Sequence, residues 1–89
     1  MVHIGGEYVV SIDDIVMILD NEKAVRNRET SLFLKKWTEK ENIFQMQEEK
    51  CESIVLTENN GKRKAYYSSI KSSTLWKRSI KIMEKGRGE

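Results

Sequence analysis

The chain has 89 residues, 38% hydrophobic and 34% charged, with a formal net charge of +2. A chain of this length forms one domain with a modest core and little room for a deep active-site cleft. It has no run of about 18 apolar residues, and MVHIGGEYVV lacks a basic segment before a long apolar one, so we expect neither a membrane span nor a signal peptide. The single Cys51 fits a reducing compartment, and we expect a cytoplasmic protein.

Charged residues are unevenly distributed along the chain. Residues 1–25 contain five acidic side chains and one basic, residues 26–49 five of each, and residues 50–89 ten basic and four acidic. This asymmetry is a mild indication of a polyanionic partner. A solvated basic surface would show the same distribution, so charge alone leaves both interpretations open.

The first residues predict two short strands. HIGGEYVVS reads as strand, turn and strand, with Gly5 and Gly6 at the turn, where positive φ angles are common. No GKS/T or GxGxxG pattern accompanies the two glycines, so they do not indicate a phosphate-binding loop.

The next segment, VVSIDDIVMILD, fits two structures. As a helix it would place apolar residues at i, i+3, i+4 and i+7 from Ile12, with a serine as its cap. As a strand, IVMIL is a β-branched apolar run typical of strands covered on both faces. Because a helix would expose Met17 and Ile18, and because the run is short, we favour a strand, with Asp13 and Asp14 turning the chain.

The middle of the chain predicts a helix and a weak strand. NRETSLFLKKWTEKEN is helical in pattern, with Asn27 or Thr30 as its cap and with Leu32, Phe33 and Trp37 on one face. NIFQMQ, which follows it, is a weak strand.

The segment SIVLTENNGKRKAYYSS predicts a β-hairpin. Asn60-Gly61 suits a two-residue type I′ turn between two β-prone runs. That turn sets a register in which Glu58 lies opposite Arg63, an opposite-charge pair, and in which the other facing residues are apolar. The apolar pairs are Leu56 with Ala65, Ile54 with Tyr67, and Val55 with Tyr66.

The last predicted element is a helix over SSTLWKRSIKIMEKG. Its cap lies among Ser72 to Thr74, and Gly86 is expected to end it. Apolar side chains fill an arc of about 160° and basic ones an opposed arc of about 100°, so the apolar face is either core or interface. The apolar arc holds Leu75, Trp76, Ile80, Ile82 and Met83, and the basic arc holds Lys77, Arg78, Lys81 and Lys85.

We do not expect an enzyme. His3 is the only histidine and has no second metal-type ligand at useful spacing, and Cys51 stands alone. Asp13 and Asp14 are adjacent, so on a strand they would point to opposite faces, which indicates turn chemistry and not an acid–base pair. We therefore expect no metal, no other cofactor and no small-molecule substrate.

Nucleic-acid binding fits the charges better. Nine basic residues and one acidic residue lie between Lys62 and Arg87, and basic side chains bind duplexes mainly through phosphate contacts and counterion release. Tyr66 and Tyr67 could stack on bases, but in a paired strand we expect one ring in the core and the other partly exposed. The candidate phosphate contacts are Lys50, Lys62, Arg63, Lys64, Lys77, Arg78 and Lys81.

HIGGEYVVSIDDIVMILD, followed by SIVLTENNGKRKAYYSSIKSSTLWKR, resembles the small bacterial extracellular matrix regulatory proteins RemA and RemB, and is more similar to the RemB branch. The shared features are hIG, VVS and DIV.I.D, and later SIVLT and YYS.I...TL..R. The resemblance covers most of the chain and is weakest at residues 21–50. It implies a mainly-β α+β subunit with two helices, similar to the LytTR DNA-binding domain, in which IVMIL is a strand. It also implies closed rings that activate biofilm-matrix operons by binding DNA.

The DNA contacts of these relatives transfer only in part. Their arginines just after VS fall here at Asp13 or Asp14, and those before the later strand fall at residues 49–51, where only Lys50 is basic. An acidic side chain facing phosphate is repulsive. Either the basic residues 62–64 and the basic helix take over, or the protein acts through protein partners.

We therefore expect a single domain over residues 1–89, with fraying at residues 86–89 left open. The first hypothesis is a cytoplasmic, ring-forming transcriptional regulator whose partner is double-stranded DNA. The alternative is an oligomeric scaffold that binds another polypeptide and not DNA. In that case Asp13 and Asp14 would form an acidic docking edge, with which the basic helix of an adjacent subunit could pair.

Overall fold

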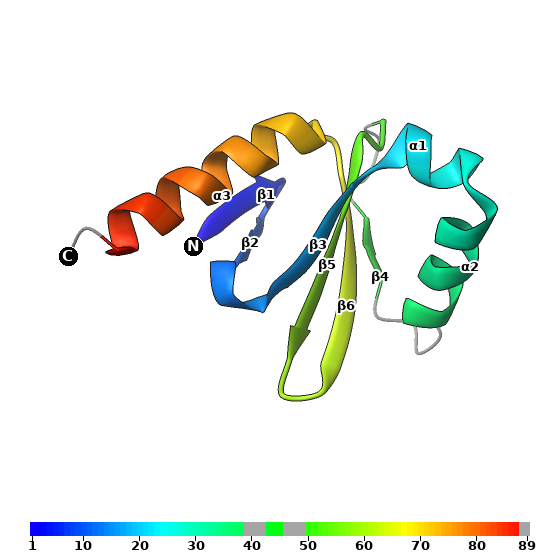
Figure 1. The fold of residues 1–89 in the computed structure, drawn as a ribbon, viewed down its shortest axis with the longest axis horizontal. Helices are drawn as coiled ribbons and strands as arrows, with labels where there is room; N and C mark the ends of the chain where they lie inside the picture. Colours follow the sequence, from blue (N-terminus) through cyan, green and yellow to red (C-terminus); the bar gives the residue numbers. More distant parts are fainter. Residues whose placement is uncertain (39–42, 46–49, 88–89) are drawn as a thin grey trace.

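The computed structural model describes residues 1–38, 43–45 and 50–87. Within this part, two sheets and three α-helices form an α+β domain, which confirms the predicted fold class with one more helix than expected (Figure 1). The two-stranded sheet pairs β1 with β2, and the four-stranded sheet has the order β3-β5-β6-β4. The elements are β1 (Val2–Gly5), β2 (Tyr8–Val10), the 3-10 helix η1 (Ile12–Asp14), β3 (Ile15–Asp20), α1 (Asn21–Arg26), α2 (Arg28–Trp37), β4 (Ile43–Gln45), β5 (Ser53–Asn59), β6 (Lys62–Ser68) and α3 (Ser72–Arg87).

The N-terminal segment is a bent β segment, as predicted. β1 and β2 form an antiparallel pair, and Gly5 and Gly6 both have positive φ angles in the turn between them. The side chain of Ser11 then accepts a hydrogen bond from the backbone N–H of Asp13 at 3.4 Å, which caps the single turn η1. The chain leaves this turn as β3, so the aspartates reverse the path between two strands.

Strand β3 is covered less completely than its sequence predicts. It lies at an edge of the four-stranded sheet and pairs only with β5, with a register shift between Ile15 and Met17. Ile18 is buried, but Val16 is 50% exposed and Met17 is also exposed. The subunit itself therefore covers only part of this strand, and coverage of the rest by a neighbouring copy stays a prediction.

The β5–β6 hairpin forms in the predicted register. Glu58 pairs with Arg63, and the three predicted apolar pairs face one another. Asn60 and Gly61 have φ angles of 52° and 78°, the left-handed values that a type I′ turn needs. β4 adds parallel to β6, which confirms the weak strand for residues 43–45, while the rest of NIFQMQ lies outside the described residues.

Two short helices follow β3 where one was predicted. Asp20 accepts a hydrogen bond from the backbone N–H of Lys23 and begins α1, and Asn27 caps α2 by accepting from Thr30. The buried residues of α2 are Leu34 and Trp37, whereas Leu32 and Phe33 are exposed. Phe33 and Trp37 lie on one side of α2, as predicted, with ring centroids 5.6 Å apart, but the residue buried beside Trp37 is Leu34, which packs in the cluster under α1 and the sheet.

Helix α3 differs from its prediction at both ends. Ser72, Ser73 and Thr74 lie inside the helix, and Gly86 does not end it. Only part of the predicted apolar arc is buried, because α3 packs mainly on β1 and β3 with one narrow side (Figure 1). Leu75 is 0% exposed and Ile82 is partly buried, whereas Trp76, Ile80 and Met83 are exposed.

The four-stranded sheet separates two clusters of buried side chains. Val55 and Tyr66 belong to the cluster under the N-terminal strands and α3. Ile54, Leu56 and Ala65, which alternate with them along β5 and β6, belong to the cluster under α1 and α2. None of the described helices is both long and apolar enough to cross a membrane.

Candidate nucleic-acid interface

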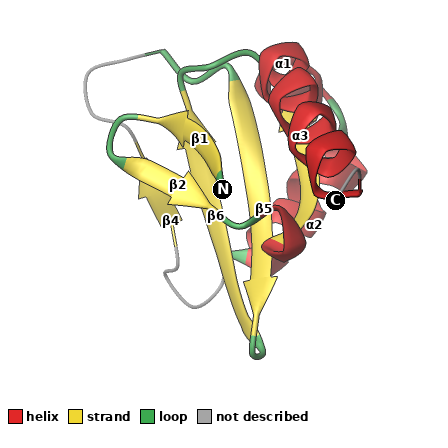
Figure 2. Ribbon diagram, turned by 90° about the vertical axis from the view of Figure 1, so that its left-hand side faces the viewer, coloured by secondary structure: helices red, strands yellow, loops and turns green. Residues whose placement is uncertain are grey.

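The end of the β5–β6 hairpin projects beyond the rest of the subunit. Figures 1 and 2 share a vertical axis, and in both views the turn at Asn60-Gly61 is the lowest point of the ribbon. Lys62 follows this turn directly and pairs with Asn59 across the hairpin. The end of the two-stranded ribbon, with the exposed Lys62 beside the turn, therefore projects at one end of the molecule.

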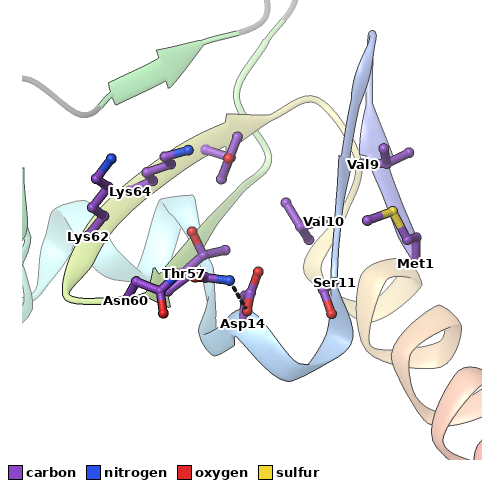
Figure 3. A pocket seen from close by; sticks show the side chains of 11 residues that line it. Met1, Val9, Val10, Ser11, Asp14, Thr57, Asn60, Lys62 and Lys64 are labelled. Atoms are coloured by element: carbon purple, nitrogen blue, oxygen red, sulfur yellow. Dashed lines mark hydrogen bonds between the residues drawn. The ribbon is translucent and has the colours of Figure 1, made fainter.

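Two of the predicted basic residues lie together on one face of this ribbon. Lys62 and Lys64 are separated by one residue, so their side chains leave β6 on the same side (Figure 3). They line a hollow of about 400 Å³ between the hairpin and the N-terminal segment. Its other lining residues are Met1, Val9, Val10, Ser11, Asp14, Thr57, Asn59, Asn60 and Tyr66. The hollow thus combines positive charge, hydrogen-bonding groups and an apolar end.

Arg63 lies on the opposite face and is engaged within the fold. Its guanidinium carbon lies 4.8 Å from the ring centroid of Trp37, and its Nε is 3.8 Å from a carboxylate oxygen of Glu58. Trp37 in turn donates its indole N–H to the carbonyl of Lys64 at 3.0 Å. Arg63 therefore helps to attach α2 to β6, and it does not share a surface with Lys62 and Lys64.

Lys50 lies at the other end of the sheet. It precedes Ser53, where β5 begins, and β5 then runs six residues to Asn59 beside the turn. At about 3.4 Å per residue, this separates Lys50 from the hairpin end by about 20 Å. Lys50 is exposed, but within one subunit it does not join the hairpin lysines.

The basic stripe of α3 is divided between solvent and the fold. Lys77 and Lys81 are exposed. Arg78 is partly buried, and its Nη1 donates a hydrogen bond to the carbonyl of His3 at 2.7 Å, which ties α3 to β1. The side chain of Lys85 lies outside the described residues. Two of the three predicted helical contacts therefore remain free for a partner.

The two aspartates have different environments. Asp13 is exposed on η1, and Asp14 is partly buried at the mouth of the hollow. Asn59 donates its side-chain N–H to Oδ1 of Asp14 at 3.0 Å, which joins η1 to the hairpin (Figure 3). Sequence reasoning missed this contact because 45 residues separate the partners and no local pattern relates them.

The tyrosine pair divides as predicted. Tyr66 is 8% exposed and stacks on Phe44, with ring centroids 5.0 Å apart, while Tyr67 is partly exposed. Burial raises the pKa of both phenols, and for Tyr66 the negative charges of Tyr8 and Asp14 raise it further, against a side-chain hydrogen bond with Thr57. The buried ring closes the floor of the hollow and does not stand out as a stacking platform.

The residues considered for catalysis are occupied with local contacts. His3 donates from Nε2 to the carbonyl of Gly6 at 3.0 Å. Cys51 donates to the carbonyl of Ser53, and burial raises the pKa of its thiol. Among the described residues, no three His, Cys, Asp or Glu side chains lie close enough together to hold a metal ion.

Comparison with known proteins gives one family. The family model described as "RemA-like: Extracellular matrix regulatory protein A-like" matches residues 1–79, which is most of the chain. No curated protein matches the sequence. The match does not separate the two branches of the family, so similarity to the RemB branch stays a prediction. Because the model covers far more than half of the sequence, the chain belongs to the RemA-like family of extracellular matrix regulatory proteins.

Proposed function

We propose that this protein is a ring-forming, DNA-binding regulator of transcription that acts on extracellular-matrix genes in the cytoplasm. The family name supports the matrix regulon. The observation that carries DNA binding is the projecting β5–β6 ribbon with Lys62 and Lys64 on one face. The proposal includes a LytTR-like mode of folding, no cofactor and no catalytic step.

A two-stranded ribbon fits duplex DNA by size. The major groove of B-DNA is about 12 Å wide and admits a ribbon of this kind. With the ribbon in the groove, Lys62 and Lys64 can reach phosphates along one wall. Lys77 and Lys81 are secondary contacts, because they are exposed on a separate element. Arg63 and Arg78 are left out of the contact set, since both are engaged by other parts of the subunit. Arg63, although its side chain is 56% exposed, lies over the Trp37 ring, and Arg78 donates to the His3 carbonyl.

Exposed apolar side chains support the ring. One group lies on α3, where Trp76, Ile80 and Met83 follow the spacing of a single helix face. Another lies on the edge strand β3, at Val16 and Met17. Adjacent copies that cover these groups would form an oligomer, and several weakly basic subunits bound to one duplex gain affinity through multivalency.

The second candidate is a scaffold that binds proteins and not DNA. The same apolar face of α3 favours it, because an exposed Trp with flanking Ile and Met side chains is typical of protein contacts. In this case Lys77 and Lys81 would contact an acidic polypeptide, and the hairpin lysines would be dispensable.

One sample tests both candidates. Light scattering gives the mass of the purified protein, and retention of random and promoter-type duplex is then measured at low and physiological salt. The proposal expects an oligomer whose affinity falls steeply with salt, because lysine–phosphate contacts release counterions. An oligomer that ignores duplex even at low salt supports the scaffold, and a monomer overturns the ring.

A further inference from the structure

We infer that the hollow beside the hairpin reads a base pair, with Asp14 and Asn59 accepting a hydrogen bond from the exocyclic amine of cytosine in the major groove. This rests on the proposed DNA binding and assigns the sequence-reading residues within it.

The first step is the orientation of the Asn59 amide. Its Nδ2 lies 3.0 Å from Oδ1 of Asp14. The reverse orientation would bring an amide oxygen against a carboxylate oxygen, which is repulsive, so the carboxylate fixes the amide with its N–H inward. What remains free is Oδ1 of Asn59 and Oδ2 of Asp14. The pair therefore presents hydrogen-bond acceptors to a partner.

The second step is the position of this pair beside the basic residues. Asp14, Asn59, Lys62 and Lys64 line the same hollow, and Asn59 faces Lys62 directly across the hairpin. A phosphate would be repelled by the carboxylate and held by the lysines. A bound strand is therefore placed with its phosphates toward Lys62 and Lys64, and with its base edges toward Asp14.

The third step is the chemistry of the base edge. In the major groove, cytosine presents the N4 amine as a donor, whereas thymine presents O4 and guanine presents O6 and N7, all acceptors. A pair of hydrogen-bond acceptors therefore binds the N4 amine of cytosine and rejects the acceptor atoms of thymine and guanine. Adenine also has an amine, but the adjacent N7 acceptor would face the carboxylate.

The experiment uses the whole protein and two conservative variants. D14N removes the charge and gives residue 14 a donor, while keeping the size of the side chain. D13N makes the same change one residue away, on an exposed side chain that does not line the hollow. Duplexes bound by the wild-type protein are selected from a random library. Each cytosine in the selected site is then replaced by 2-pyrimidinone, which lacks only the N4 amine.

At one cytosine, removal of the amine should weaken wild-type and D13N binding by about tenfold. For D14N, removal of the amine at that position should change the affinity little, since the contact between residue 14 and the amine is already altered. The weaker base pairing of the analogue is common to all three proteins and cancels in the comparison. The salt dependence of D14N should match that of the wild type, because the lysines are unchanged.

The other outcomes overturn the inference in distinguishable ways. If D14N loses as much as the wild type at every cytosine, or if the selected duplexes show no preference at any position, the hollow does not read cytosine although DNA binding stands. If the wild-type protein retains no duplex at low salt, the proposed function fails and the inference with it. Thermal unfolding of D14N is the control: an unfolding temperature close to that of the wild type means that the hairpin is intact and that only the contact with DNA is lost.

Discussion

The β5–β6 hairpin and helix α3 are the two basic regions of this protein, and their Lys and Arg side chains have different surroundings. Each carries a run of adjacent Lys and Arg residues, KRK in the hairpin and KR in the helix. In the hairpin, the alternation of the strand sends Lys62 and Lys64 to one face and Arg63 to the other. In the helix, Lys77 is exposed while Arg78 binds the carbonyl of His3.

In both regions an arginine contacts another part of the subunit, whereas Lys62 and Lys77 are exposed. Lys64 is intermediate between the two groups, because it is partly buried and its Nζ lies 5.7 Å from the ring centroid of Phe44. A guanidinium is planar, stacks on aromatic rings and donates several hydrogen bonds, so it suits the Trp37 ring and the His3 carbonyl. An ammonium on a flexible stem is strongly hydrated, which suits the exposed Lys62 and Lys77. The charge count of the sequence therefore overstates the surface available to a polyanion.

The largest expected effect on stability comes from weakening the packing of α3 on the sheets. Leu75 lies on the inner side of this helix and is fully buried, and we expect L75A to lower the free energy of unfolding by about 2–5 kcal/mol, through lost burial and the cavity left behind. Denaturant unfolding measures the change. I80A on the exposed side of the same helix is the matched control, and it should cost far less. Similar losses for the two variants would mean that Ile80 is buried in an assembled state.

The next effect compares the lysines of the two regions directly. K62Q/K64Q and K77Q/K81Q remove the same charge from the hairpin and from the helix. The hairpin variant should reduce the slope of log affinity against log salt by about two for each subunit in contact, at about 0.9 per phosphate. Binding to a duplex, titrated at several salt concentrations, measures this slope. A larger change for the helix variant would transfer the proposed interface to α3.

The hairpin could be predicted in full because its determinants are local. Asn60-Gly61 sets the turn, the turn sets the register, and charge and packing agree with it at each pair. β3 was recognised because its apolar run is too short for an amphipathic helix. The cap of α2 at Asn27 was also visible, since capping depends on residues three apart.

What sequence reasoning missed depends on distant contacts. The partners of the Arg78–His3 and Asn59–Asp14 hydrogen bonds are 75 and 45 residues apart, so no periodicity could pair them. α1 was missed because its six residues include only two apolar ones, and its position is fixed by Asp20 at the end of β3. Whether the apolar arc of α3 is core or interface was left open, because a 160° arc does not say how much of it the subunit itself covers.

A smaller effect is expected at the hairpin turn. Gly61 has a φ angle of 78°, and a Cβ built there would meet no atom within 4 Å, so only the backbone conformation opposes a side chain. G61A should therefore cost about 1–2 kcal/mol of unfolding free energy. G61N should cost less, because asparagine tolerates this region better. Thermal unfolding of the two variants orders them, and equal stability of G61A and the wild type would contradict the type I′ turn.

The smallest effect is expected for the adjacent basic residues Arg78 and Lys77 of α3, of which only Arg78 contacts β1. R78A removes the charged hydrogen bond to the His3 carbonyl, and we expect a loss of about 1 kcal/mol, since a net hydrogen bond at a solvated position contributes about that much. K77A, the adjacent exposed residue, should change stability by less than about 0.5 kcal/mol. R78K keeps the charge but not the fork of donors, so it should recover only part of the loss. If R78K restores full stability, the attachment of α3 to β1 depends on charge alone. If K77A costs as much as R78A, the two basic residues are equivalent and the distinction between structural arginines and free lysines fails for this helix.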